Sequence, residues 1–447
     1  MSRRWLAVLA GVSGVATAVI LAGGNSPSDA LLAARAALKN PPVSYSIAPE
    51  IKTVTVPASN GNSNASATHS GGKKKSTSQS QTTTAKTTKT TATTATTTST
   101  TSSTTTTTPT NAGLPKVKHV FLIALSTPSY ATLFGAKVTT DPYLQTLSKK
   151  GALLAGYRTL GGGELADQIA MLTGQPPNAD TRAGCPSYKA FPASAEPNAK
   201  TGIVPGNGCV YPDTALSLAD ETDSSHGDWD AYIEALGSSA CPTPNANASM
   251  ADEYPGTEAA YDPWHNPFIF FGSLEQDGGC FESDLALSAL SHALSRKDLT
   301  PTLAYVAADA CADGNPTIVA SAGSTTTTST TAGGTPQTTT TANPQPVGCP
   351  TGDTNGLAAE DAFLKAWVPK IEQSPAYKKG GVIVIAFSGN GTKAAPTGVL
   401  VLSKWTKPRR STADFNPYSL LRSVEQMLGY SYLGDAADAK SFAHLVL

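Results

Sequence analysis

The chain of 447 residues has little charge: charged residues make up 15% of it, and the formal net charge is -1. A protein that binds nucleic acid through its overall field carries a strong basic excess, so this class is excluded and no nucleic-acid partner is expected. The 32 prolines and 39 glycines also exclude a long coiled coil, which needs sustained Ala, Glu, Lys and Leu.

Several familiar site motifs are missing as well. The sequence has no GxSxG nucleophile elbow, no P-loop, no HExxH zinc motif and no GxGxxG in a βαβ context. Five histidines lie in the region expected to fold, and no two cysteines form the CxxC pair of a clustered thiolate site. No catalytic set can be assembled from these motifs.

The N-terminal segment indicates export. Arg3 and Arg4 precede an uncharged run from Trp5 to Gly24 that is long enough to span a bilayer. Residues 1–25 are therefore predicted to be a signal peptide or a signal anchor, and the export route stays open. We expect an extracytoplasmic protein that is either membrane-anchored through this apolar segment or secreted.

Six cysteines lie in the region expected to fold. An even number in an exported chain favours disulfide bonds over metal ligands. The simplest arrangement joins neighbours along the chain, namely Cys185 with Cys209, Cys241 with Cys280, and Cys311 with Cys349. Spacing alone does not prove this connectivity.

Threonine-rich segments divide the chain into domains. Between Thr82 and Thr110, 20 of 29 residues are Thr, and such a segment lacks the apolar surface that would offset its ordering entropy. Residues 26–115 are therefore predicted to be a disordered Ser/Thr-rich linker or stalk, followed by one folded domain at 116–447. A second Thr-rich run, Ser324 to Thr341, predicts an exposed loop insertion at 321–345.

Within the folded region, the pattern predicts alternating strands and helices. The dipeptides Asp-Pro at 141–142 and Asn-Pro at 416–417 are typical of helix starts, and segment 358–373 is amphipathic. Continuous apolar runs of the buried-strand type occur at 120–125, 303–307, 382–387 and 399–402. This alternation predicts one doubly wound α/β domain with a mostly parallel sheet.

Ligands of such sheets bind outside the carboxyl ends of the strands. The side chains expected at those ends are Ser126 and Thr127, Ser388, and the group Asp309, Asp313 and Asn315. The last group is also compatible with an ordinary turn tied by a disulfide, because Asp, Gly, Asn and Pro are common turn residues.

Two further segments supply candidate polar groups. Three glycines at 161–163 precede Glu164 and Asp167, and acids at a helix start occupy the place of an anion, which predicts a self-capped helix. His265 and Asn266 lie in an aromatic loop and could be pocket or structural residues. His119 precedes the first strand and belongs to the opposite edge of the sheet.

The order of these segments resembles the bacterial phosphoesterase family that includes acid phosphatases and phospholipase C-type enzymes. The likeness covers about 115–447, and its pieces are KHVFLIALSTPSYATLFG at 118–135, AMLTGQ at 170–175, WDAYIE at 229–234, HNPF at 265–268 and YSLLRSVE at 418–425. The resemblance implies an alkaline-phosphatase-like three-layer α/β/α sandwich. It also implies metal-assisted phosphoester hydrolysis, with carboxylates and His on the metal and a hydroxyl nucleophile.

The chain departs from the family pattern at its chemical positions. Ser126 and Thr127 replace Glu-Asn, Glu164 replaces the nucleophile, Asn315 and Pro316 replace a His and an Asp, and Ser388 and Gly389 replace Asp-Glu. Hydroxyl groups, glycine and proline do not provide the charge that holds a divalent ion. The sequence therefore predicts that the catalytic and metal positions are largely lost, with no resident cofactor.

The leading hypothesis is a non-catalytic module that binds an unidentified envelope ligand or protein, or organises the envelope. Its vestigial pocket would comprise Ser126, Thr127, Glu164, Asp167, His265, Asn266, Asp309, Asp313, Asn315 and Ser388. The alternative is an active phosphoester hydrolase, acid phosphatase or phospholipase C-like, with a divalent metal on a rearranged site. That site would be drawn from Glu164, Asp167, Asp309, Asp313 and His265. A surface-displayed structural or adhesive module is the third class.

Overall fold

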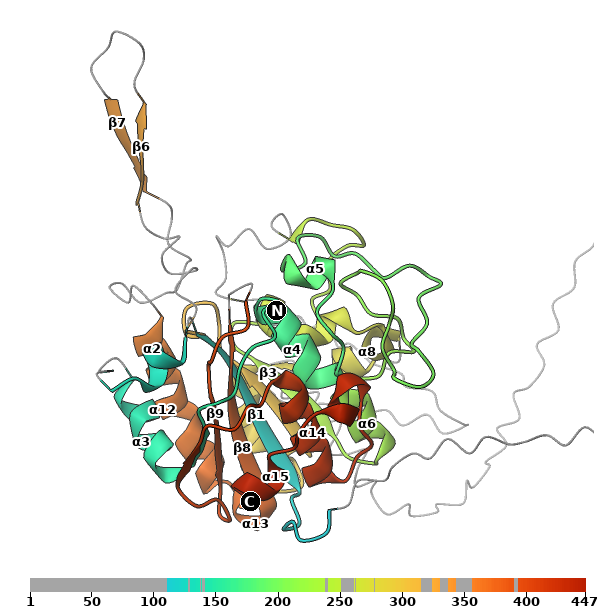
Figure 1. Cartoon of the computed structure of the whole chain (residues 1–447), viewed down its shortest axis with the longest axis vertical. Coiled ribbons are helices and arrows are strands. Elements are labelled where there is room, and N and C mark those ends of the chain that lie inside the picture. The colour runs from blue at the N-terminus through green and yellow to red at the C-terminus, as the bar shows by residue number, and fades with distance from the viewer. Residues whose placement is uncertain are drawn as a thin grey trace, which may run out of the picture. The chain divides into compact units, whose positions relative to one another are not determined.

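A computed structural model gives the fold of the chain (Figure 1). The described residues are 111–447, except 128, 137, 139–140, 238–239, 251–260, 262, 277, 315–323, 330–336, 343–355 and 390–392. The predicted signal segment and most of the predicted linker lie outside these residues, as do Asn315 and Cys349.

Strand β1 (His119–Thr127) lies inside an eight-stranded sheet with the order β10-β2-β9-β8-β1-β5-β3-β4. It pairs in parallel with β5 (Leu303–Ala307) on one side and with β8 (Gly381–Gly389) on the other. The remaining strands are β2 (Ala152–Leu154), β3 (Trp229–Ile233), β4 (Asp284–Ala286), β9 (Val399–Ser403) and β10 (Arg409–Ser411). All four strands predicted from apolar runs are present, and the sheet is mostly parallel.

Strand β9 is an exception to the parallel arrangement. It runs antiparallel to both β8 and β2. The connection from β8 to β9 spans only residues 390–398, whereas a parallel neighbour needs a crossover of a dozen or more residues. Chain length between the two apolar runs therefore determines their relative direction.

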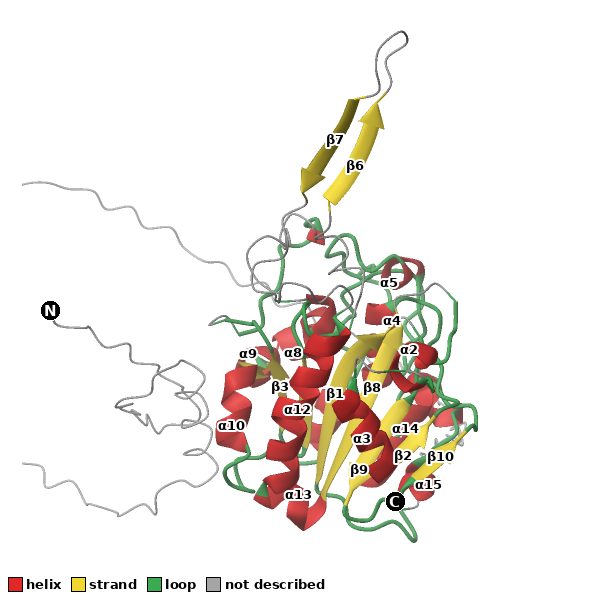
Figure 2. Ribbon diagram, turned by 90° about the vertical axis from the view of Figure 1, so that its left-hand side faces the viewer, coloured by secondary structure: helices red, strands yellow, loops and turns green. Residues whose placement is uncertain are grey.

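Helices cover both faces of the sheet, as Figures 1 and 2 show. The longer ones are α3 (Pro142–Lys150), α4 (Glu164–Thr173), α12 (Leu357–Gln373) and α14 (Pro417–Leu428). The shorter α-helices are α2 (Tyr130–Phe134), α5 (Ala179–Arg182), α6 (Leu218–Ser224), α8 (Gly272–Gln276), α9 (Gly279–Ser283), α10 (Leu290–Ala293), α13 (Pro375–Gly380) and α15 (Ala443–Val446). Four 3₁₀ turns are η1 (Pro263–His265), η2 (Pro267–Phe270), η3 (Leu287–Ala289) and η4 (Gly434–Asp438).

The side chains of β1 alternate between two separate cores. Val120, Leu122 and Ala124 pack on the side of α4 and α14. Phe121, Ile123 and Leu125 pack on the side of α3 and α12. Each buried Leu, Ile or Phe stabilises the fold by about 1.5–3 kcal/mol relative to an exposed one. This division confirms the predicted fold class, an α/β/α sandwich around a mostly parallel sheet.

The predicted helix starts are present, although they are capped differently. The Asn416 side chain accepts a hydrogen bond from the Ser419 N–H at 3.1 Å at the start of α14. Asp141 stands at the corresponding position of α3 but makes no side-chain cap, and Pro142 occupies the first helical turn. The third predicted helix corresponds to α12.

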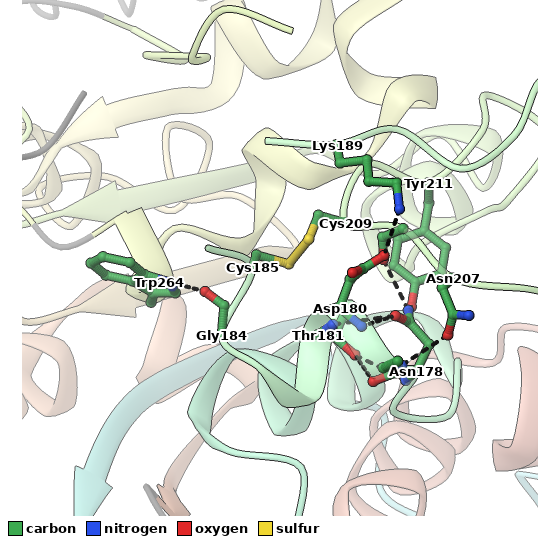
Figure 3. The surroundings of a disulfide bond; sticks show 12 residues. Asn178, Asp180, Thr181, Gly184, Cys185, Lys189, Asn207, Cys209, Tyr211 and Trp264 are labelled. Carbon is green, nitrogen blue, oxygen red and sulfur yellow. Dashed lines mark hydrogen bonds and ion pairs between the residues drawn. A yellow bond between two sulfur atoms is a disulfide. The ribbon is translucent and has the colours of Figure 1, made fainter. Parts of the chain in front are cut away.

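Two of the three predicted disulfide bonds are confirmed. Cys185 is bonded to Cys209 (Figure 3), and Cys241 is bonded to Cys280. The third predicted pair includes Cys349, which lies outside the described residues.

The second Thr-rich run differs from the predicted loop. It contains a two-stranded antiparallel sheet, β6 (Ser324–Ser329) and β7 (Gln337–Ala342), in which Thr325 pairs with Thr341. Threonine is β-branched and favours extended backbone, so a Thr-rich segment can form a ribbon without contributing to the main core.

Across the described residues, no helix has both the length and the apolar character needed to cross a membrane. The apolar run that predicts a signal or anchor, residues 5–24, is outside this range.

Candidate metal centre

The carboxyl ends of β1, β5 and β8 meet at one edge of the sheet, where the candidate residues gather. Ser126 of β1 is paired in register with Ser388 of β8, and both are buried. The backbone N–H of Ser126 donates to the carbonyl oxygen of Asp313 at 2.6 Å, which holds the segment after β5 against the end of β1. The residues predicted from the strand ends therefore lie together at one edge of the sheet.

Helix α4 brings Glu164 to this edge. The helix begins at Glu164 after an N-cap glycine, and the predicted acids Glu164 and Asp167 both lie in its first turn. The Glu164 carboxylate contacts the imidazole of His265 through Oε1 and Nε2, because η1 lies against the start of α4.

Glu164, His265 and Asp313 form the candidate metal centre. His265 and Asp313 are fully buried, and the Glu164 side chain is nearly so. Nε2 of His265 lies 3.5 Å from Oδ2 of Asp313 and also contacts Oε1 of Glu164. One ligand atom from each residue lies within 4.8 Å of the other two. The three residues come from α4, η1 and the loop after β5.

The donor set fits a divalent transition metal. Ligands about 2.1 Å from a tetrahedral zinc ion are about 3.4 Å apart, close to the separation between His265 and Asp313. One imidazole and two carboxylates suit Zn²⁺ better than Ca²⁺ or Mg²⁺, which take oxygen ligands. A candidate ligand set is thus present where the leading hypothesis expected none.

Asp167 lies one turn after Glu164 but is used differently. Its Oδ1 accepts a hydrogen bond from the Leu160 N–H at 2.8 Å, and its Oδ2 accepts one from the Gly389 N–H at 3.4 Å. These bonds connect α4 to the end of β8. Burial, and to a smaller extent the charge of Glu164, raise the pKa of Asp167 to about 7. Asp167 therefore exchanges a proton near neutral pH.

Asp309 also remains outside the group of three. Its Oδ1 accepts hydrogen bonds from the backbone N–H groups of Cys311 and Ala312, both at 3.0 Å, and so closes the turn after β5. The Asp309 N–H donates to Glu234, which follows β3. Burial, and then the charge of Asp309, raise the pKa of Glu234 to about 7. Asp309 is therefore a turn residue, as one of the two interpretations of this segment predicts. The carboxylate of Asp313 lies at the candidate centre.

The other predicted residues lie near the centre without joining it. The Ser126 hydroxyl donates to the Ser388 carbonyl at a long 3.5 Å, and Thr127 ends β1. Asn266 donates from Nδ2 to Oδ2 of Asp284 at 2.8 Å. His119 is at the opposite end of β1, as predicted, with Nδ1 2.9 Å from the Pro301 carbonyl.

Sequence reasoning missed two acids around this edge. Glu360 of α12 is fully buried and lies close to Gly314, the residue after Asp313. A Cβ added to Gly314 would lie only 2.2 Å from Oε2 of Glu360. It occupies one position of an amphipathic helix, and no local pattern distinguishes it. Glu234 directly follows the apolar strand β3, so the strand-end rule could have found it.

The comparisons with known proteins concern the fold. No protein-family model and no curated protein matches the chain. A protein of the alkaline phosphatase superfamily from Vibrio parahaemolyticus is 12% identical, with 73% of this chain and 69% of that chain covered and a TM-score of 0.40. A phosphonate monoester hydrolase from Silicibacter pomeroyi is 11% identical, with coverages of 74% and 76% and a TM-score of 0.37. A sulfatase from a Pseudoalteromonas species is 9% identical, with coverages of 70% and 68% and a TM-score of 0.38.

With identities of 9–12% and TM-scores of 0.37–0.40, these likenesses carry no argument about the superfamily of the chain or about the residues at the candidate centre. They do not separate the narrower acid phosphatase or phospholipase C-like family from other members.

Proposed function

We propose that the chain is a non-catalytic binding module of the phosphoesterase type that holds one divalent cation. The cation would be held by Glu164, His265 and Asp313. The supporting observation is the convergence of these three side chains at the carboxyl edge of the sheet, with ligand atoms within 4.8 Å of one another.

The residues around the centre favour binding over turnover. By the family resemblance, Glu164 stands where a hydroxyl nucleophile is expected, and its carboxylate is turned to His265. Ser126 and Ser388 stand where carboxylates are expected, and hydroxyl groups are weak ligands for a second ion. A bound divalent cation would offset the two carboxylate charges and present its open positions to an anionic ligand such as a phosphate ester.

Metal-dependent phosphoester hydrolysis is the second candidate, and Asp167 favours it. A pKa of about 7 suits a general acid or base at neutral pH, and Asp167 lies on the same helix as Glu164.

The test is a metal-binding titration combined with turnover assays on the full oxidised chain. Zn²⁺ and Mn²⁺ affinities would be compared for wild type, Glu164→Gln, Asp313→Asn and the control Asp309→Asn, which retains its turn-closing oxygen. We expect a loss of about tenfold or more in the first two variants and less than about twofold in the control.

Turnover separates the two candidates. Hydrolysis of p-nitrophenyl phosphate and bis(p-nitrophenyl) phosphate would be followed across pH with Mg²⁺, Ca²⁺, Mn²⁺ and Zn²⁺. We expect none. Metal-dependent hydrolysis that is lost in Asp313→Asn would establish the second candidate, and a wild-type protein that binds no metal would overturn both.

We also propose that the module acts outside the cytoplasm, tethered by residues 1–25 and binding an envelope ligand or protein. Two disulfide bonds support an oxidising compartment. The test is fractionation of cells that express the full chain or a chain starting at residue 26. Equal distribution of the two forms would contradict the tether.

A further inference from the structure

His265 is carried by a very short element. The 3₁₀ turn η1 has three residues and ends at His265, and a single 3₁₀ turn has poor hydrogen-bond geometry of its own. The Nδ1 atom of His265 lies 3.4 Å from the carbonyl of Ala308, a long contact. A metal ligand has to be held within a fraction of an ångström of its productive position. The backbone carbonyl of His265 accepts a hydrogen bond from the Tyr305 hydroxyl at 3.2 Å, and the hydrogen bonds of the two neighbouring residues add to the fixation of this turn.

The residue before His265 is held by the first disulfide-bonded segment. Trp264 donates from its indole Nε1–H to the carbonyl oxygen of Gly184 at 2.6 Å, as Figure 3 shows. Gly184 directly precedes Cys185, which is bonded to Cys209. Cys185 has a φ of +50°, a left-handed conformation that is unfavourable for a residue with a Cβ. The disulfide bond therefore helps to keep this carbonyl in place.

The residue after His265 is held by the second disulfide-bonded segment. Asn266 donates from Nδ2 to Oδ2 of Asp284 at 2.8 Å, and the same oxygen accepts the Cys241 N–H at 3.0 Å. Cys241 also has a left-handed φ, +49°, and is bonded to Cys280 on α9, the helix that leads directly into Asp284. Asn266 and Asp284 are both fully buried.

We propose that the two disulfide bonds position His265, one through Trp264 and the other through Asp284 and Asn266. The inference depends on the proposed metal centre for its function, but the positioning itself can be measured without metal. Trp264, Asn266 and Asp284 are positioning residues, because each acts on the centre through His265.

The first arm of the test is the Zn²⁺ affinity of the full oxidised chain, with matched pairs of variants. Trp264→Phe removes the indole donor next to His265. The control Trp405→Phe removes an indole that follows β9 at the opposite edge of the sheet, where Ser403 pairs with Val382 at the start of β8. Asp284→Ala removes the shared acceptor, whereas Asp284→Asn keeps one acceptor oxygen. We expect Trp264→Phe and Asp284→Ala to weaken Zn²⁺ binding by about tenfold or more, and both controls to change it less than about twofold.

The second arm follows the imidazole NMR signals of His265 in the metal-free protein, assigned by comparison with His265→Gln. We expect these signals to shift or broaden in Trp264→Phe, in Asp284→Ala, and when either cysteine pair is replaced by serine. Signals that stay at their wild-type positions in every folded variant would overturn the inference, even if Zn²⁺ binds. Displaced signals in a protein that binds no Zn²⁺ would support the positioning and reject the metal centre. If either Trp264→Phe or Asp284→Ala fails to fold, the variant that removes the other hydrogen bond still provides the test.

Discussion

Replacing Glu425 with Gln is expected to change how the stability of the fold depends on pH. Glu425 lies on α14 and is fully buried. Its Oε1 accepts a hydrogen bond from the Leu433 N–H at 2.8 Å, and within the described part of the chain its Oε2 has no hydrogen-bond partner. Burial, and then the charge of Glu221, raise the pKa of Glu425 to about 9. The side chain is therefore protonated in the folded protein at neutral pH.

The size of the effect follows from this pKa. The ordinary value is 4.5, so the unfolded chain releases a proton that the folded chain keeps. The contribution of Glu425 to stability is complete below pH 4.5 and is lost as the pH rises to about 9. The loss is at most about 1.4 kcal/mol per pH unit, or about 3 kcal/mol at pH 7. Gln keeps an acceptor oxygen for Leu433 and does not titrate.

Urea unfolding at several pH values measures this difference. We expect the free energy of unfolding of Glu425→Gln, minus that of wild type, to increase by about 1 kcal/mol per unit between about pH 5.5 and pH 8.5. The control is Glu282→Gln, the same substitution at an exposed position of α9. A difference for Glu425→Gln that is flat or decreases with pH would refute this account of the buried carboxyl.

Two further substitutions test the geometry around the candidate centre. Gly314→Ala would place a Cβ 2.2 Å from Oε2 of Glu360 at a φ of +84°, whereas Gly206→Ala has a φ of +102° and no atom within 4 Å. We expect a loss of about 3 kcal/mol or more for the first and about 1–2 kcal/mol for the second in urea unfolding. Equal losses would show that Glu360 and the Ser126 carbonyl, which is 2.7 Å from the same Cβ, both yield freely. Replacing Cys185 and Cys209 with serine should lower stability by about 3 kcal/mol for a separation of 24 residues, and an unchanged melting temperature would contradict this.

The strands and the sheet edge could be predicted because their signals are local. Each central strand is a continuous apolar run that is too short for a buried helix, and this length identifies it as a buried strand. The direction of β9 depended on the length of its connection to β8, which an apolar pattern does not encode. The β6–β7 ribbon was missed because the Thr-rich composition was interpreted as an exposed loop, whereas threonine also favours extended pairing.

The candidate centre was predictable only in part, because its members are distant in sequence. Glu164, His265 and Asp313 were among the five residues considered for a rearranged site, and α4, η1 and the loop after β5 bring them together. Comparison with the family pattern emphasised positions whose ligands are missing. It could not show that a carboxylate at the nucleophile position would reach a histidine about one hundred residues later.

Local hydrogen bonding explains which of the five candidates remain outside the group. Asp309 has backbone N–H groups two and three residues ahead of it in the same turn, and its carboxylate accepts from both. Asp167 accepts from Leu160, which precedes its helix, and from Gly389 at the end of β8. Asp313 turns its carboxylate to His265 instead, while its backbone carbonyl holds the end of β1. A carboxylate that closes its own turn, or that ties two elements together through backbone N–H groups, is therefore a weaker ligand candidate than its position at a strand end suggests.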